Sequence, residues 1–299
     1  MQRSDLGHPR AVSKSHIEMS LDSDDECSRI RHIILSMLQK QKLGARALTL
    51  DQSFVRRCLE EAASLGCPME AVGDHPSFHK STTIGAAIAF FAYNYIKDED
   101  VKVYIGTYTS IIIYIEDTFG DKPEVVYDFN ARFTSGQSQS AVLSAQVDAN
   151  FQADGHALFS CRCRFPAYVR NMSGNGEPYV MFMFPRDMDF KVYAQAIPTL
   201  ALAIDYLNDV MSFYKEELAG ETNNYVSLMA KHCGAAKLDI LQRVADQVVS
   251  WLSTAETLLS TSQPAREALR HFSQGYVDYH TSASRYQLRE LMGDEFVIN

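Results

Sequence analysis

Asn208, Ser212 and Glu216 stand at positions i, i+4 and i+8, which successive turns of a helix bring to one stripe. The three side chains would then lie within about 12 Å along the helix axis. An amide oxygen, a hydroxyl and a carboxylate are hard ligands that suit Mg²⁺, a cation that also binds phosphate oxygens. The pattern predicts a metal site, with Lys215 beside it as a positive charge for a diphosphate. A solvated helix face has the same spacing, and for this triple in isolation it is the commoner explanation.

A second acidic cluster lies upstream, in the segment from Tyr114 to Asp121. Asp117 and Asp121 are at i and i+4, while Glu116 lies about 100° round the helix from Asp117. Gly120 is expected to end the helix, so that Asp121 leaves this geometry. The helix dipole disfavours carboxylates at this end, which favours a bound cation over the alternative of an acidic loop.

Both clusters come at the ends of segments that are apolar on most sides, residues 101–117 and 193–217. A helix that is apolar nearly all round is surrounded by protein. Buried polar groups are costly unless they are paired or coordinate a cation. The placement of the two clusters therefore supports a metal site at the ends of two buried helices.

Helical periodicity extends along most of the 299 residues, and the alternation typical of strands is scarce. Clusters of Gly and Pro divide the chain into about ten helical stretches. The sequence contains no Gly-Ser linker and no internal repeat. We therefore predict an all-α fold, with one helical domain at residues 27–299 behind a mobile N-terminal tail at residues 1–26.

The chain carries 28 Lys and Arg against 37 Asp and Glu, a formal net charge of −9. It has no general basic field for a polyanion, so nucleic acid is not an expected partner. A phosphate-bearing ligand must be held by a few local cations or by metal ions. Apolar runs stop short of the roughly 20 residues that span a bilayer, and residues 1–20 lack the apolar core of a signal peptide. We expect no membrane span and a cytoplasmic location.

Two further motifs complete a set of four. Gly275-Tyr276-Val277 is followed by Ser284-Arg285-Tyr286, and the segment from Pro166 to Gly174 contains Arg170. In this order the motifs resemble those of class I terpene cyclases, most closely the fungal trichodiene synthase group. The string from Asn208 to Glu216 resembles that group's (N,D)D(L,I,V)x(S,T)xxxE motif at nearly every position. The resemblance covers roughly residues 78–291, and four ordered motifs are much more specific than one.

The resemblance implies a class I terpenoid synthase helical bundle around an apolar active-site cavity. It also implies ionisation of a prenyl diphosphate, with farnesyl diphosphate as the expected substrate, and cyclisation to a sesquiterpene in fungal secondary metabolism. Three Mg²⁺ ions are implied, and a homodimer is compatible with the family. The implied metal ligands are Glu116, Asp117, Asn208, Ser212 and Glu216. The implied diphosphate ligands are Arg170, Lys215, Arg285 and Tyr286.

Two of these assignments have competitors. The family's aspartate-rich motif usually opens with Asp, and the aligned position here is Glu116. The alignment favours Glu116 as the leading metal ligand, with Asp117 close behind. Arg162 and Arg164 lie near enough in the sequence to compete with Arg170 as the residue that senses diphosphate.

A carbocation intermediate needs an apolar pocket, where an aromatic face can stabilise it by about 2 kcal/mol or more. Individually, each aromatic residue is more often plain core packing, but Tyr108 and Phe213 are distinguished by their position on the two motif helices. The candidates for the cavity wall are Phe90, Tyr93, Tyr108, Tyr114 and Phe213.

Two other functions compete with cyclisation. A prenyl-chain-elongating transferase has a similar helical fold but expects two DDxxD motifs, which the Asn, Ser and Glu of the second cluster do not match. A non-catalytic helical protein descended from a cyclase is compatible with Glu116 in place of the usual Asp. The retention of Asn208, Ser212, Arg285 and Tyr286 argues against it.

Overall fold

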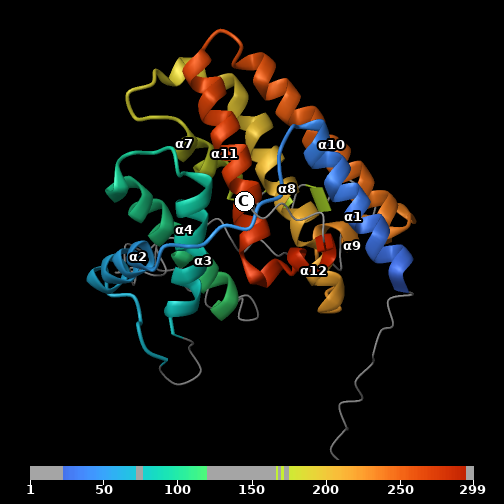
Figure 1. The fold of residues 1–299 in the computed structure, drawn as a ribbon, viewed down its shortest axis with the longest axis horizontal. Coiled ribbons are helices and arrows are strands. Elements are labelled where there is room, and N and C mark those ends of the chain that lie inside the picture. The colour runs from blue at the N-terminus through green and yellow to red at the C-terminus, as the bar shows by residue number, and fades with distance from the viewer. Residues whose placement is uncertain (1–22, 72–76, 120–165, 168–169, 172–174, 294–299) are drawn as a thin grey trace, which may run out of the picture.

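The computed structural model describes residues 23–71, 77–119, 166–167, 170–171 and 175–293. Every regular element in these ranges is a helix, so the predicted all-α class is confirmed (Figure 1). The α-helices are α1 (Ser23–Lys40), α2 (Gln52–Ser64), α3 (His79–Ala92), α4 (Glu99–Phe119), α7 (Gly176–Met183), α8 (Ile197–Leu218), α9 (Tyr225–Cys233), α10 (Lys237–Leu258), α11 (Gln263–Ser282) and α12 (Leu288–Met292). Short 3₁₀ turns form η2 (Phe190–Val192), η3 (Ala194–Ala196) and η4 (Ser284–Tyr286).

Figure 1 shows α2, α3 and α4 on one side of α11, and α1, α10 and α12 on the other. In the first group, α3 packs against α4 and also contacts α11, while α2 covers α3 and α4. In the second group, α1 lies along α10, which packs against α8, and α8 also packs against α7. A continuous apolar core connects the two groups. This arrangement brings α4 and α8, the two helices that end in the predicted clusters, to one cavity that residues of both helices line.

The two helices predicted to be buried are present with different bounds. α4 contains the whole predicted segment, and Ile105 and Ile115 are fully buried, but Tyr104 is 61% exposed. Protein therefore surrounds α4 on only part of its circumference. α8 begins at Ile197 and not at residue 193, because Pro198 stands in its first turn, where the missing N–H costs no hydrogen bond.

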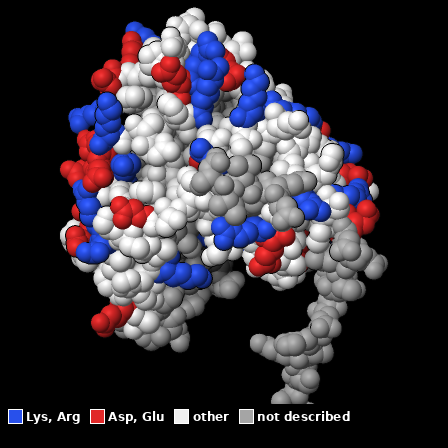
Figure 2. Space-filling model, viewed as in Figure 1, with Lys and Arg blue, Asp and Glu red and all other residues white. Residues whose placement is uncertain are grey.

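The predicted N-terminal tail, residues 1–26, falls mostly outside the described residues. α1 begins at Ser23, so residues 23–26 are already helical, and the boundary between tail and domain stays a prediction. Figure 2 shows positive and negative side chains interspersed over the face that it presents. Within the described part of the chain, no helix is both long enough and apolar enough to cross a membrane.

Gly275 explains how closely α11 approaches α3. A Cβ atom at this position would lie 2.8 Å from the Ala92 Cα atom and still closer to the carbonyl oxygen of Phe91. These are backbone atoms, so they cannot move aside as a side chain can. Gly275 therefore allows α11 to pack directly on the backbone of α3, which fixes how close the next residue, Tyr276, lies to α3.

We expect Gly275→Ala to lower the free energy of unfolding by about 1–3 kcal/mol, the usual cost of overpacking. The clash outweighs the roughly 1 kcal/mol by which Ala is the better helix former. Urea denaturation of the variant measures the loss. Gly44→Ala is the matched control, because a Cβ there meets nothing within 4 Å. Equal stabilities of the two variants would contradict the close-packing argument.

Candidate active site

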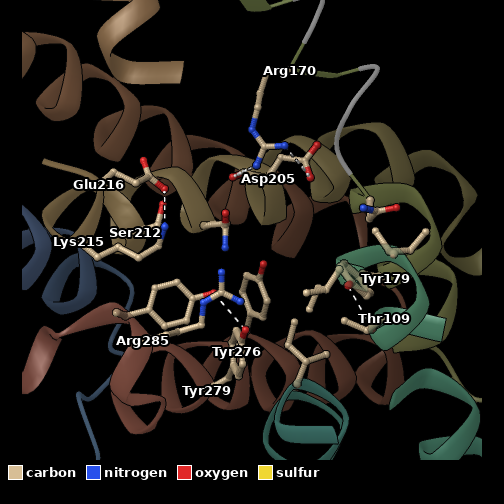
Figure 3. A pocket seen from close by; sticks show the side chains of 16 residues that line it. Thr109, Arg170, Tyr179, Asp205, Ser212, Lys215, Glu216, Tyr276, Tyr279 and Arg285 are labelled. Atoms are coloured by element: carbon tan, nitrogen blue, oxygen red, sulfur yellow. Dashed lines mark hydrogen bonds and ion pairs between the residues drawn. The ribbon is translucent and has the colours of Figure 1, made fainter. Parts of the chain in front are cut away.

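A cavity of about 170 Å³ lies between α4, α7, α8, α11 and η4 (Figure 3). One side is apolar and is formed by Ile88 of α3 with Ile112 and Ile113 of α4. The other sides carry polar and charged groups from α8, α11 and η4. The cavity can therefore hold a ligand with one apolar and one anionic end.

Asn208, Ser212 and Glu216 line this cavity together. α8 is helical from Ile197 to Leu218, and its period brings residues four apart to one face, as the sequence predicts. Ser212 is 2% exposed, and its hydroxyl has no hydrogen-bond partner among the described residues. Leaving a buried hydroxyl unpaired costs about 1–3 kcal/mol. Its position is therefore better explained by a ligand than by the stability of the fold.

The amide of Asn208 is within hydrogen-bonding distance of the imidazole ring of His280, a residue of α11. The Asn208 Nδ2 and His280 Nε2 atoms are 3.1 Å apart, and His280 Nδ1 lies 2.7 Å from the carbonyl oxygen of Tyr276. Burial lowers the pKa of His280 to about 3, so its ring is neutral. Sequence analysis missed His280, because a histidine within a helix has no signal of its own.

Lys215 and Glu216 form an ion pair near the C-terminal end of α8. Lys215 Nζ donates to Glu216 Oε1 at 3.1 Å, and the two side chains are 19% and 14% exposed. Both line the cavity. In this pair the Lys215 ammonium group lies beside the Glu216 carboxylate, and it can exchange that carboxylate for an incoming anion.

Arg285 and Tyr286 belong to η4, which follows α11, and both line the cavity. Figure 3 shows Arg285 across the cavity from Ser212 and Glu216 of α8. The Tyr286 hydroxyl donates to that of Tyr279 at 3.1 Å. Burial raises the pKa of Tyr286. The phenol therefore stays protonated near neutral pH, and it can donate to an anion only by turning its one proton away from Tyr279.

Arg170 also lines the cavity, held there by two carboxylates of α8. Its Nε atom lies 2.9 Å from both carboxylate oxygens of Asp209, and its Nη1 atom lies 3.8 Å from Asp205 Oδ1. The side chains of all three are at most 18% exposed. Burial raises the pKa of Asp205 to about 7, an effect that Arg170 partly offsets. Sequence analysis missed both carboxylates, although Asp209 stands inside the quoted motif.

The acidic cluster upstream is only partly described. Glu116 and Asp117 belong to the last turn of α4, and their side chains lie outside the described residues. They follow Ile112 and Ile113 by four residues each, on a helix whose cavity side those isoleucines define. This spacing leaves the choice between Glu116 and Asp117 open. Asp121 also lies outside the described residues.

The two arginines that compete with Arg170, Arg162 and Arg164, fall outside the described residues as well. Arg170 itself is described and lines the cavity. Its position beside α8 keeps it as the assigned candidate.

The predicted aromatic wall is not the one that lines this cavity. None of Phe90, Tyr93, Tyr108, Tyr114 and Phe213 is among its lining residues. The helix period explains one case: on α4 the cavity side carries Thr109, Ile112 and Ile113, so Tyr114 falls on another face. Tyr108 packs against Phe182 instead. Tyr93 and Phe213 are fully buried core residues. The aromatic residues that do line it are Tyr179, Tyr276, Tyr279 and Tyr286.

The residues on α8 fit a hard divalent cation. They offer an amide oxygen, a hydroxyl oxygen and a carboxylate at helical spacing on one side of the cavity. The Ser212 hydroxyl, which has no partner among the described residues, is a donor atom left over for such an ion. Mg²⁺ accepts oxygen ligands of this kind and keeps further positions for water and phosphate. The arrangement can bind a metal-diphosphate group next to an apolar surface.

Comparison with known proteins gives concordant results. The sequence model of the trichodiene synthase (TRI5) family matches residues 148–296. Alpha-cuprenene synthase COP6 of Coprinopsis cinerea is 26% identical over 89% of this chain and 90% of its own length. Terpene synthase BipA of Cochliobolus sativus is 30% identical over 79% and 82%. Monoterpene synthase 25 of Postia placenta is 30% identical over 70% and 72%.

Proposed function

Because this chain belongs to the trichodiene synthase family of terpene synthases, we propose that it ionises farnesyl diphosphate in a Mg²⁺-dependent reaction. The bond between the prenyl carbon and the diphosphate oxygen breaks, and diphosphate leaves with the electron pair. The allylic cation then cyclises, and loss of a proton from the cyclised cation gives the sesquiterpene. One observation carries the proposal. A single cavity with an apolar side is lined by the three oxygen-bearing residues of α8 and by the three diphosphate donors: Asn208, Ser212 and Glu216, and Lys215, Arg285 and Tyr286.

Metal binding is assigned to two elements. Asn208, Ser212 and Glu216 of α8 would hold Mg²⁺ from one side, and Glu116 or Asp117 at the end of α4 from the other. Bound Mg²⁺ supplies Lewis-acid stabilisation of the charge that develops on the departing oxygens. The resemblance to the family supports three ions.

The chain's own donors bind and orient the diphosphate. Lys215 and Arg285 contribute charge-assisted hydrogen bonds, and Tyr286 adds a third donor once its one proton turns from Tyr279 to the anion. Arg170 adds a cation whose charge is partly offset by Asp205 and Asp209. Once the diphosphate is bound, these donors are in place to stabilise the leaving group as it departs.

The prenyl chain is assigned to the apolar side of the cavity. Ile88, Ile112 and Ile113 exclude water from the cation there. Tyr276 and Tyr279 line the same cavity, and burial raises the pKa of each phenol far above its usual value. The rings stay neutral and present aromatic faces to a desolvated cation.

The proposal is tested by incubating the protein with Mg²⁺ and, separately, with C10, C15 and C20 prenyl diphosphates. The C10 substrate is included because one relative is named a monoterpene synthase. We expect volatile C15 products and stoichiometric diphosphate from farnesyl diphosphate, both abolished by a chelator. Longer diphosphates would instead identify an elongating transferase, and a lack of turnover with every substrate would identify a non-catalytic protein.

A further inference from the structure

His280 is a buried polar residue enclosed by aromatic rings. It is 0% exposed, and its ring centroid lies 4.7 Å from that of Tyr276, 4.9 Å from that of Tyr279 and 4.5 Å from that of Tyr286. These rings hold the imidazole in one orientation. A polar ring in such an apolar enclosure needs both of its nitrogen atoms paired.

The hydrogen bonds of His280 have fixed directions. The carbonyl oxygen of Tyr276 can only accept, so His280 Nδ1 carries the proton that lies between them. The amide nitrogen of Asn208 faces Nε2 at 3.1 Å. An amide nitrogen can only donate, so Nε2 is the acceptor in this contact. Turning the amide over would put two acceptors against each other at this distance.

The orientation of the whole Asn208 amide follows from this contact. The amide is planar, and its nitrogen faces His280 Nε2. Its carbonyl oxygen is therefore the atom left for the cavity that Asn208 lines.

We propose that His280 is a positioning residue that holds the Asn208 amide with its carbonyl oxygen turned toward the metal site. This inference rests on the proposed function, because it takes Asn208 as a metal ligand. A rotated amide would present an NH₂ group to the cation and would repel it. His280 therefore acts on metal affinity through Asn208, without contacting metal or substrate.

Two conservative variants separate this role from simple packing. His280→Gln places an amide oxygen near the position of Nε2 and keeps an acceptor for Asn208. His280→Asn keeps a donor near the position of Nδ1, but its side chain ends short of Asn208. Both remove the imidazole ring from the same enclosure. His271→Asn is the control on the same helix, because His271 stacks on Tyr95 at 5.6 Å, outside the cavity lining.

The experiment measures the binding of Mn²⁺ in the presence of inorganic diphosphate. Binding is quantified from the decrease in the electron paramagnetic resonance signal of free Mn²⁺. Loss of an outer-shell partner costs about 10- to 100-fold in metal affinity, and we expect a weakening of this size for His280→Asn. His280→Gln and His271→Asn should stay close to the wild-type affinity. In turnover, the Mg²⁺ midpoint of His280→Asn should rise by the same factor, and saturating Mg²⁺ should restore its rate. Melting of the metal-free proteins reports any loss of folding.

Equal Mn²⁺ affinities of the Gln and Asn variants would overturn the proposal and leave His280 as core packing, as would a wild-type protein that binds no Mn²⁺. The proposed function fails separately. A protein that shows the predicted difference in Mn²⁺ binding but turns over no prenyl diphosphate retains the positioning role and loses the cyclase assignment. A protein that turns over prenyl diphosphate, but whose Gln and Asn variants bind Mn²⁺ equally, retains the cyclase assignment and loses the positioning role.

Discussion

Replacing both Asn208 and Ser212 by alanine is expected to lower turnover of farnesyl diphosphate by on the order of 10³-fold or more, because metal ions stabilise the departing charge by several kcal/mol. The change removes two of the three oxygen ligands assigned to α8 and leaves Glu216. Released diphosphate and volatile products measure the rate, and circular dichroism shows whether the helices are kept. Wild-type turnover in this variant would refute the metal assignment.

Ser212→Ala alone gives a sharper signature, in which activity and stability change independently. The Ser212 hydroxyl is buried and has no hydrogen-bond partner among the described residues, so its removal should leave the unfolding midpoint unchanged or raise it. Ser227→Ala is the matched control. The Ser227 hydroxyl is also buried without a hydrogen-bond partner among the described residues, but it does not line the cavity. We expect the same stability response there with full turnover. An equal loss of turnover in both variants would contradict the assignment of Ser212.

Arg170→Met is expected to lower the free energy of unfolding by about 3–5 kcal/mol, because it leaves two buried carboxylates without their cation. Met keeps much of the length of the side chain, so the missing charge dominates. Arg57→Met is the surface equivalent: Arg57 also pairs with two carboxylates, Glu99 and Asp100, but is 40% exposed. Surface pairs contribute about 0–1 kcal/mol. Similar losses in the two variants, measured by urea denaturation, would contradict the argument from burial.

The loss in Arg170→Met should also depend on pH. Burial raises the pKa of Asp205 to about 7 in the native protein, and removing the guanidinium raises this pKa further. A carboxyl whose native pKa lies above its unfolded value destabilises the native state progressively as the pH rises between the two values. The variant should therefore lose less stability at pH 5 than at pH 8. Adding Asp209→Asn should recover part of the loss at pH 8.

The sequence was sufficient for features that depend on one helix. Asn208, Ser212 and Glu216 share a face because the period of a helix is fixed, and the structure places all three at one cavity. The all-α class followed from the same periodicity. Helix limits were less accurate where local chemistry intervened, as at Pro198, which starts α8 later than apolar periodicity suggests.

Contacts between helices could not be predicted in this way. The pairing of Arg170 with Asp209 and of His280 with Asn208 depends on which faces of distant segments meet. The five predicted wall residues do not line this cavity for a related reason: residue type and helix membership were known, but the side of each helix that faces the cavity was not. Tyr108 lies next to Thr109 in the sequence, yet Thr109 lines the cavity and Tyr108 packs against Phe182.

The isoleucines of the cavity and its diphosphate donors come from different helices. Ile88 belongs to α3, and Ile112 and Ile113 belong to α4, whereas Lys215, Arg285 and Tyr286 stand on α8 and η4. Of the groups assigned to the start of the reaction, only Glu116 and Asp117 share a helix with the isoleucines. The surface that shapes the hydrocarbon can therefore accumulate substitutions while the diphosphate donors are left unaltered. Such a division makes the scaffold evolvable, because new products require changes at a few aliphatic positions while ionisation is preserved. Saturation libraries at Ile88, Ile112 and Ile113 are the direct way to exploit it.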